Sequence, residues 1–324
     1  MYDGKRVLII DQLNLFFRNY IVNPALSTNG APIGGLRGCM QSIQKICRES
    51  KPDYIVICWD GEGGSAKRKS MQKDYKKGRK PIRLNRGVRN MTPEEEMENK
   101  IWQQTRLIDY YNHVPVIQLM YKSTEADDII AYVSGLKELQ NAEKLIVSSD
   151  KDFHQLLTGK TVQYRPIQKE ILNENNIIEK YDIHPTNFAM ARAMVGDKSD
   201  NIVGIPGMGL KTVAKRFPFL KESKTASFDD VLDYCREMLE NSKVKAYERV
   251  LESEALIRKN YAIMQLYAPM LTVNAKKEIR EIFSDPDLSF NKTELLKMMI
   301  KDGFGEINFI DLFQHLNKIS IDNR

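Results

Sequence analysis

The sequence from residue 144 to residue 157 reads KLIVSSDKDFHQLL. Its apolar run Leu145–Val147 predicts a buried strand, and Asp150 and Asp152 follow the end of that strand two residues apart. Because open parallel sheets bind ligands beyond the carboxyl ends of their strands, these two acids are candidates for a cation site. An Asx turn with an aspartate at the N-cap of a short helix also explains them, so this stretch alone leaves both interpretations open.

Two earlier segments follow the same pattern of an apolar strand that ends in an acid. Residues 6–11 close on Asp11, and residues 54–60 close on Asp60. Helical spacing occupies residues 13–21, 36–49 and 123–136, and residues 114–120 form a further apolar stretch. Strands that alternate with helices in this way predict the α/β class, with a three-layer, mostly parallel sheet flanked by helices.

The segment STEADDIIAYVSGL, residues 123–136, predicts a helix with three acids in its first turn. Thr124 followed by Asp127 resembles a capping box with Thr124 as the N-cap, and acids at a helix start favour the helix dipole. Capping does not account for all three acids, because Glu125 and Asp128 share one helix face while Asp127 points elsewhere. If the helix packs on the sheet, its first turn lies near the strand ends.

Asp197 and Asp200 follow a helix-like segment that ends at Val195. Gly196 fits an ordinary helix C-cap, but two acids at that end oppose the helix dipole. The chain therefore carries nine candidate carboxylates: Asp11, Asp60, Glu125, Asp127, Asp128, Asp150, Asp152, Asp197 and Asp200. In one cleft these acids repel each other unless hard cations neutralise them, and the shortage of histidine favours Mg²⁺ or Mn²⁺. Two such ions serve the in-line attack of water on a phosphodiester.

Composition narrows the class of protein. A chain of 324 residues can bury one large core or two modest ones. No apolar run approaches a membrane span and the N-terminus lacks the layout of a signal peptide, so we expect a soluble, cytoplasmic protein. The four cysteines form no CxxC pair and the four histidines are scattered, which argues against a disulfide framework or a zinc site. The net charge of +6 is unevenly distributed, which favours a polyanionic partner.

Residues 67–89 form a strongly basic run that follows the Asp60 strand directly. The run contains one acid, Asp74, and the cations Lys67, Arg68, Lys69, Lys73, Lys76, Lys77, Arg79, Lys80, Arg83, Arg86 and Arg89. A solvated surface is the ordinary explanation of such a run, but its position over the acidic cleft suits attraction of a nucleic-acid backbone. The run ends at Thr92 and Pro93, which predict the start of a helix.

A second phosphate-binding element is predicted in GIPGMGLKT, residues 204–212. Its glycines allow a tight turn that presents backbone N–H groups at a helix start, and Lys211 adds positive charge. It follows GDKSDN, residues 196–201, directly. Residues 201–217 therefore predict a helix–hairpin–helix, which binds the duplex backbone without reading bases.

These motifs together resemble the flap endonuclease/5′-exonuclease family, which includes phage ribonuclease H of the T-even type and phage 5′-nucleases. The resemblance rests, in order, on IIDQLNLFFR, ICWD, DYKKGR, TEADDIIA, SSDKDFHQLL and GDKSDNIVGIPGMGLKT. It implies a PIN-like nuclease domain over residues 1–200 with a basic helical arch inserted at about 61–104. Residues 201–324 would form a helical DNA-binding and C-terminal domain.

The resemblance also implies roles for individual residues. Five acids would surround a first metal ion, namely Asp11, Asp60, Glu125, Asp127 and Asp150. Asp152, Asp197 and Asp200 would hold a second ion, with Asp128 assisting. Lys76 and Arg79 would contact the phosphate that is cut. Contacts to nucleic acid are expected from Tyr75, Lys77, Arg83, Gly207, Gly209, Lys211 and Thr212. A K⁺ ion is expected at the helix–three-turn–helix, because backbone carbonyls bind potassium there in many members.

The predicted function is that of a Mg²⁺-dependent 5′-3′ exonuclease and flap endonuclease, with primer removal of the ribonuclease H type. Its substrates would be branched or primer-bearing DNA and RNA–DNA duplexes. We expect a monomer that acts in replication, in the host cytoplasm if a phage encodes it. Single-strand-binding protein or a sliding clamp would be its protein partners, and residues 306–319 form either a core helix or a tail for such a partner.

Two other functions fit parts of the sequence. A phosphatase of the haloacid dehalogenase type also has an aspartate after its first strand, but it needs a second one where Leu13 stands. A module that only binds DNA would keep the basic elements and have no use for nine acids. Metal-dependent hydrolysis of a labelled flap distinguishes the three functions.

Overall fold

The computed structural model describes residues 1–79, 83–85, 87–88 and 91–323. Its main sheet has six strands in the order β3-β2-β1-β4-β5-β6. The strands are β1 (Arg6–Asp11), β2 (Tyr54–Trp59), β3 (Ile117–Met120), β4 (Glu143–Val147), β5 (Thr161–Arg165) and β6 (Glu170–Leu172). All neighbouring pairs are parallel except β5 and β6, which confirms the predicted mostly parallel sheet.

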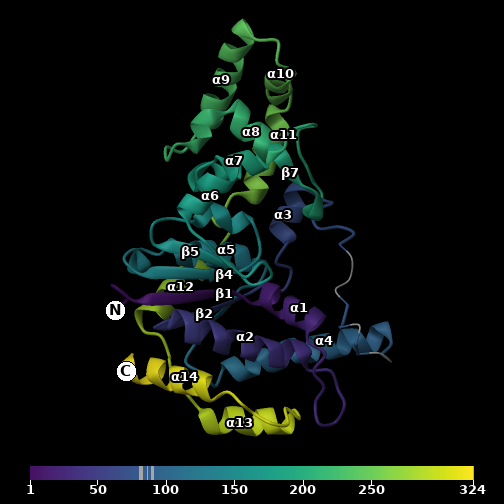
Figure 1. Ribbon diagram of the computed structural model, residues 1–324, viewed down its shortest axis with the longest axis vertical. Coiled ribbons are helices and arrows are strands. Elements are labelled where there is room, and N and C mark those ends of the chain that lie inside the picture. Colours follow the sequence, from purple (N-terminus) through teal and green to yellow (C-terminus); the bar gives the residue numbers. More distant parts are fainter. Residues whose placement is uncertain (80–82, 86, 89–90, 324) are drawn as a thin grey trace.

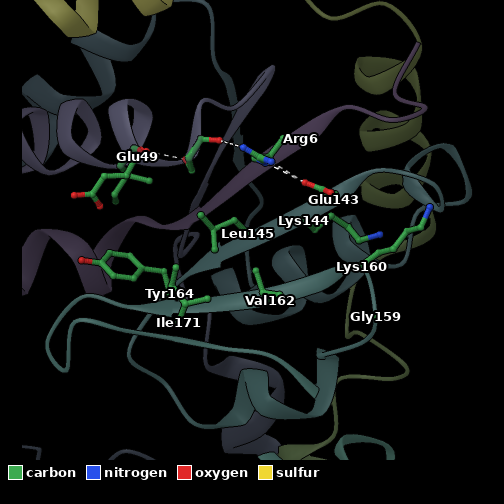
Figure 2. A pocket seen from close by; sticks show the side chains of 12 residues that line it. Arg6, Glu49, Glu143, Lys144, Leu145, Gly159, Lys160, Val162, Tyr164 and Ile171 are labelled. Carbon is green, nitrogen blue, oxygen red and sulfur yellow. Dashed lines mark hydrogen bonds and ion pairs between the residues drawn. The ribbon is translucent and has the colours of Figure 1, made fainter. Parts of the chain in front are cut away.

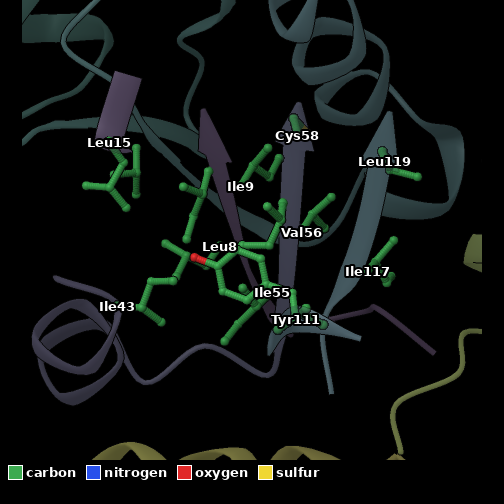
Figure 3. Packing of buried hydrophobic residues seen from close by; sticks show 14 of the residues in the cluster. Leu8, Ile9, Leu15, Ile43, Ile55, Val56, Cys58, Tyr111, Ile117 and Leu119 are labelled. Carbon is green, nitrogen blue, oxygen red and sulfur yellow. The ribbon is translucent and has the colours of Figure 1, made fainter. Parts of the chain in front are cut away.

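Helices cover both faces of the central strands. α1 (Gln12–Val22) and α2 (Gly34–Ser50) pack against each other, with α2 below the labelled strands in Figure 1, and α5 (Ala126–Ser134) packs against β1 and β2. β2 is buried along its whole length, as a parallel strand between two helical layers must be. Figure 3 shows the apolar side chains of β1, β2 and β3 packed with residues of the surrounding helices. The three-layer α/β prediction is therefore confirmed.

Local capping explains where the helices begin and end. α4 (Pro93–Tyr111) has the predicted capping box, in which the Thr92 hydroxyl accepts from the N–H of Glu95 and the Glu95 carboxylate accepts from the N–H of Thr92. The prediction that Thr124 caps α5 is wrong. Its hydroxyl donates to the Lys122 carbonyl, and the first N–H of α5 is instead capped from another strand by Asp60.

The apolar core forms two main clusters. The second cluster joins Leu157 and Leu172, the last residue of β6, to the helices above the sheet in Figure 1. These helices are α6 (Glu174–Tyr181), α7 (Pro185–Val195), α8 (Leu210–Arg216), α9 (Phe228–Asn241), α10 (Lys245–Glu252) and α11 (Glu254–Met264). A two-stranded hairpin, β7 (Gly196–Asp197) and β8 (Ile202–Val203), separates α7 from α8.

The chain then returns from α11 to the first cluster. α12 (Val273–Ser284), α13 (Lys292–Lys301) and α14 (Ile310–Asp322) contribute apolar residues to the core of the main sheet. Leu312, Leu316 and Ile319 of α14 are buried there, which supports the core interpretation of residues 306–319 over a tail for a partner. The division of the chain at residue 200 stays a prediction. In the part of the chain that the structure describes, no helix is long and apolar enough to cross a membrane.

Candidate active site

The acids predicted at the strand ends lie at one edge of the main sheet. Asp11 is the last residue of β1, and the parallel registers of β1 with β2 and β4 bring the ends of these strands level. Asp11 accepts hydrogen bonds from the Asn14 N–H (3.2 Å) and from the Ser148 hydroxyl (2.9 Å). Ser148 in turn accepts from the Asp150 N–H (3.1 Å). This buried serine therefore fixes the acids of β1 and β4 relative to each other.

The Asx turn predicted in the 144–157 stretch is present, but the residue at the N-cap of the short helix is Lys151 and not an aspartate. The Asp150 carboxylate accepts from the N–H of Asp152 at 2.8 Å, which is an Asx turn, and a 3₁₀ helix begins at Asp152. Burial and the charge of Asp150 raise the pKa of the Asp152 carboxyl to about 7. The turn therefore brings the two acids close enough to repel each other.

Four acids form what we call the unpaired cluster: Asp11, Asp60, Asp127 and Asp150. Burial, with the charges of Asp60 and Asp150, raises the pKa of the Asp11 carboxyl to about 7. Burial, with the charges of Asp150 and Asp11, raises the pKa of the Asp127 carboxyl well above its usual range. These mutual shifts show that the acids share one poorly solvated region. None of the four forms an ion pair with any residue that the structure describes.

The other five acids are paired with four resident cations: Arg68, Lys76, Arg79 and Arg192. Arg68 contacts Glu125 at 2.7 Å and Asp128 at 2.6 Å, and Lys76 contacts the second oxygen of Glu125 at 2.5 Å. Although burial opposes it, Lys76 and Arg68 hold the pKa of the Glu125 carboxyl below its usual range.

Arg192 contacts Asp152 at 3.1 Å and Asp197 at 2.5 Å, and Arg79 contacts Asp200. The four resident cations thus pair with five of the nine acids, and the unpaired cluster has no partner cation among the described residues.

The residues present fit hard divalent cations. Their donors are carboxylate oxygens with uncompensated negative charge in a poorly solvated place, which is the chemistry that Mg²⁺ and Mn²⁺ prefer. Within the described ranges, no three acidic, histidine or cysteine side chains converge closely enough to form a finished metal site. The structure therefore brings the predicted ligands into one region without arranging them around a single point.

The base and first part of the predicted arch lie against this acidic region. α3 (Ala66–Met71) carries Arg68, and the chain after it reaches Lys76, whose backbone has a left-handed φ of 56°. The N–H of Lys76 donates to the Asp200 carbonyl at 3.1 Å, and the Asn201 amide donates to the Asp74 carbonyl at 3.0 Å. A non-glycine residue in this conformation is held there only by its surroundings. The arch is therefore docked on the loop that carries Asp200.

The structure revises the expectation for Tyr75. The sequence predicts that this side chain contacts nucleic acid, but the ring is only 4% exposed and packs with Ile202, Ile263 and Met264. Its hydroxyl donates to the Glu125 carboxylate at 3.3 Å. In this arrangement Tyr75 fastens the arch to the protein, because a buried ring cannot stack on a base.

The remaining residues predicted to bind nucleic acid lie at two surfaces. Lys77 and Arg83 are exposed on the arch, where they pair with Asp74 (2.9 Å) and Glu96 (3.1 Å). Gly207, Gly209, Lys211 and Thr212 lie in the turn before α8 and in its first residues. The first three of these are exposed, and Gly207 has the positive φ of 76° that favours glycine. Lys80, Arg86 and Arg89 of the basic run lie outside the described residues.

Sequence reasoning missed three residues that organise the site. Ser148 links two strand ends, Arg68 holds Glu125 and Asp128, and Arg192 bridges Asp152 and Asp197. Arg192 is 8% exposed and lies in the apolar segment FAMARAMV of α7. A charged residue inside so apolar a helix is a signal that could have been used, because a buried arginine needs acidic partners.

A separate groove of about 400 Å³ opens at the opposite end of β4 (Figure 2). Leu145, Val162, Tyr164 and Ile171 form its apolar floor, and charged residues such as Arg6 stand at its rim. This groove contains none of the nine candidate carboxylates. The predicted chemistry therefore belongs to the acidic edge of the sheet and not to this groove.

Removal of one acid from the unpaired cluster is expected to stabilise the metal-free protein. Asp127 accepts no hydrogen bond from any described residue, so Asp127→Asn loses little and relieves repulsion. In EDTA at pH 8 we expect the variant to melt about 2 °C above the wild type. With Ca²⁺ the order should reverse, because the wild type binds the ion more tightly. Thermal melts in both buffers check this, and an unchanged melting temperature with an equal gain from Ca²⁺ would show that Asp127 lies outside the cluster.

Comparisons with known proteins agree with the geometry. Residues 6–182 match the family model of the 5′-3′ exonuclease N-terminal resolvase-like domain. A 5′-3′ exonuclease of Aquifex aeolicus is 26% identical over 94% of this chain and 96% of its own length. A flap endonuclease Xni of Shewanella sp. (strain W3-18-1) is 30% identical over 84% of this chain and 93% of its own length.

Solved structures show the same fold. A mutant of T5 5′-exonuclease superimposes with a TM-score of 0.62 and 18% identity, covering 86% of this chain and 99% of that one. The T5 D15 flap endonuclease, in a pseudo-enzyme-product complex with DNA and metal ions, has a TM-score of 0.63 and 19% identity over 93% of this chain and all of its own. The resemblance inferred from the sequence motifs is confirmed. The chain belongs to the 5′-3′ exonuclease family, whose members are hydrolytic nucleases.

Proposed function

We propose that this protein is a divalent-metal-dependent 5′-nuclease that removes 5′ flaps and primers by hydrolysing phosphodiesters. The observation that carries the proposal is the unpaired cluster, four acids without a partner cation among the described residues, next to an arch whose cations are already at the site. Negative charge without a partner cation favours the binding of metal ions, and the cations of the arch suit the phosphate of a substrate.

The metal ions would be Mg²⁺, with Mn²⁺ as a substitute. Asp11, Asp60, Asp127 and Asp150 would hold the first ion together with Glu125, and Asp152, Asp197 and Asp200 the second. When bound, two such ions lower the pKa of an attacking water and stabilise charge on the transferring phosphate. Solved proteins of this fold are described with metal ions, zinc among them, which supports a dependence of this protein on divalent metal ions.

Lys76 and Arg79 would change partners when substrate arrives. In the structure they neutralise Glu125 and Asp200. Metal ions at those acids compete for the same oxygens, so the ammonium and guanidinium groups become free to bind the phosphate that is cut. The residues then hold the substrate in place and stabilise charge that builds up during hydrolysis.

The substrates would be duplexes with a 5′ flap or a 5′ RNA primer. One solved protein of this fold, the T5 D15 flap endonuclease, is described in a complex with DNA, and the exonuclease and flap endonuclease names of the relatives support both modes of cleavage. Primer removal of the ribonuclease H type, action in replication, a K⁺ ion at the turn before α8, and contacts with single-strand-binding protein or a sliding clamp stay proposals that rest on the resemblance.

A nicked flap labelled at its 5′ end tests the proposed function. With RNA or DNA at the 5′ end, we expect Mg²⁺-dependent release of short oligonucleotides, and EDTA should abolish it. Release of inorganic phosphate alone would indicate a phosphatase, and binding without any release would indicate a module that only binds DNA. Either of these results would overturn the proposal.

Lys211 offers a test of the duplex contact. Its side chain is exposed in the first turn of α8, so we propose that it binds a phosphate of the duplex. Lys211→Ala should weaken binding of all sequences alike and reduce the slope of log K against log salt by about one unit. Titrations in Ca²⁺ at several salt concentrations measure this slope, and an unchanged slope would remove Lys211 from the interface.

A further inference from the structure

Each of the three side-chain nitrogens of Arg68 donates a hydrogen bond inside the protein. Arg68 lies on α3 at the base of the arch and is only 4% exposed. Its Nη1 donates to Glu125 at 2.7 Å and to Asp128 at 2.6 Å, and its Nη2 donates to Asp128 at 3.3 Å. Its Nε donates to the Ile263 carbonyl at 2.9 Å. A guanidinium so enclosed cannot reach a substrate, so its role must be exerted through the residues that it contacts.

Asp128 is the main partner of Arg68 and differs from its neighbour Asp127. Asp128 is 1% exposed, and both of its oxygens accept from Arg68. One oxygen also accepts from the N–H of Met270 at 2.8 Å. Protein donors therefore occupy both oxygens of Asp128, whereas Asp127 belongs to the unpaired cluster and is available for an ion.

A crossover segment, residues 263–270, completes this arrangement. It consists of the last two residues of α11 and the chain that leads from it toward α12, and thus joins the upper helices to the main sheet. Besides its contacts with Arg68 and Asp128, it binds Gln155, whose amide donates to the Met264 carbonyl (3.1 Å) and accepts from the Leu266 N–H (2.7 Å). Lys67 of α3 also contacts the Met270 carbonyl. The base of the arch is therefore fastened to α5 and to the crossover segment at the same time.

We propose that Arg68 and Asp128 are positioning residues, and that Asp128 is not a metal ligand. The pair fixes α3, and α3 sets where the following residues Tyr75 and Lys76 meet Glu125. This inference rests on the proposed function and adds to it, because it removes one of the nine acids from the metal site and assigns the arch a fixed support. Lys76 can then exchange Glu125 for a phosphate without losing its place over the acids.

A calcium titration tests whether Asp128 is a metal ligand or a positioning residue. Asp128→Asn should bind Ca²⁺ within about twofold of the wild type, whereas Asp127→Asn should bind it at least tenfold more weakly. Isothermal titration calorimetry of the two full-length variants gives both constants. Equal losses in the two variants would overturn the assignment of Asp128. Unchanged Ca²⁺ affinity in Asp127→Asn would instead argue against the proposed function.

A double-mutant cycle tests whether Arg68 acts through Lys76. Arg68→Gln and Lys76→Ala should each slow single-turnover cleavage at least tenfold, and the double variant should be hardly slower than the slower single variant. The inference would be overturned if the rate loss of the double variant equalled the product of the two single losses, or if Arg68→Gln cleaved at the normal rate. If Arg68→Gln does not melt as a folded protein, Asp128→Asn replaces it in the cycle with Lys76→Ala. The rate of that double variant is then compared with the two single rates in the same way.

Arg106 provides a matched control. It bridges two acids as Arg68 does, with Asp302 at 2.8 Å and Asp109 at 2.8 Å, but it lies on α4 and contacts none of the nine acids. Arg106→Gln should lower the melting temperature and leave the single-turnover rate within about twofold of the wild type. A rate loss as large as that of Arg68→Gln would show that general destabilisation explains both, and would overturn the positioning role.

Discussion

Asp150→Asn is expected to lower the single-turnover rate in Mg²⁺ by at least about a hundredfold while a flap binds in Ca²⁺ at least as tightly as it does to the wild type. Asp150 raises the pKa of both Asp11 and Asp127, so it lies at the centre of the repulsion in the unpaired cluster. Loss of its charge weakens the hold on metal ions that hydrolysis requires. The same loss makes the cleft less repulsive to the phosphates of the substrate.

The exposed acid Asp74 is the matched control for this experiment. It lies in the arch and, among the residues that the structure describes, forms an ion pair with Lys77 alone, at 2.9 Å. Asp74→Asn makes the same chemical change in the arch. It should leave the single-turnover rate within about twofold of the wild type. Cleavage rates at saturating enzyme and binding constants in Ca²⁺ are the measurements. A near-normal rate for Asp150→Asn would refute the metal assignment.

Lys76→Ala is expected to cleave about a hundredfold more slowly than the wild type in single-turnover experiments, and at least tenfold more slowly. It should bind substrate nearly as well as the wild type does. In the structure the ammonium group of Lys76 pairs with Glu125 at 2.5 Å. When substrate binds, this group would contact the phosphate that is cut instead. An interaction that strengthens as charge develops lowers the barrier more than it tightens ground-state binding. Removal of Lys76 should also tighten Ca²⁺ binding, because Glu125 loses a competing cation.

Lys77 is the control for Lys76, because it is the next residue of the arch and its side chain is exposed. Lys77→Ala should weaken binding slightly and leave both the single-turnover rate and the Ca²⁺ affinity unchanged. Weak binding by Lys76→Ala with an intact rate would reduce the arch to a patch that only attracts nucleic acid. Tighter Ca²⁺ binding together with a slow rate would support the exchange of partners.

Local patterns in the sequence predicted the parts of the fold that depend on local chemistry. The strands that end in Asp11 and Asp60 were predictable because an apolar run followed by an acid is a local signal. The capping box at Thr92 was predictable for the same reason. β5 and β6 were missed, because their short runs mix apolar and polar residues and gain their burial from β4 and the helices around them.

The misassigned residues depend on contacts between distant segments. Tyr75 looked like a nucleic-acid contact because it stands among cations, but Ile202 and Ile263 bury it, and both are more than a hundred residues away in the chain. Thr124 does not cap α5, because the first N–H of that helix donates to Asp60, the residue that follows β2. Spacing along the sequence cannot reveal which distant carboxylate or apolar group will contact such a residue in the folded protein.

The contacts of the crossover segment with Arg68 and Asp128 set an order for assembly during translation. The first five strands of the sheet precede residue 166, so the acids at the strand ends are synthesised long before Ile263 and Met270. A nascent chain that stops before residue 263 offers Arg68 no carbonyl for its Nε and offers Asp128 no backbone N–H. Most of the chain must therefore leave the ribosome before Arg68 and Asp128 can complete their hydrogen bonds.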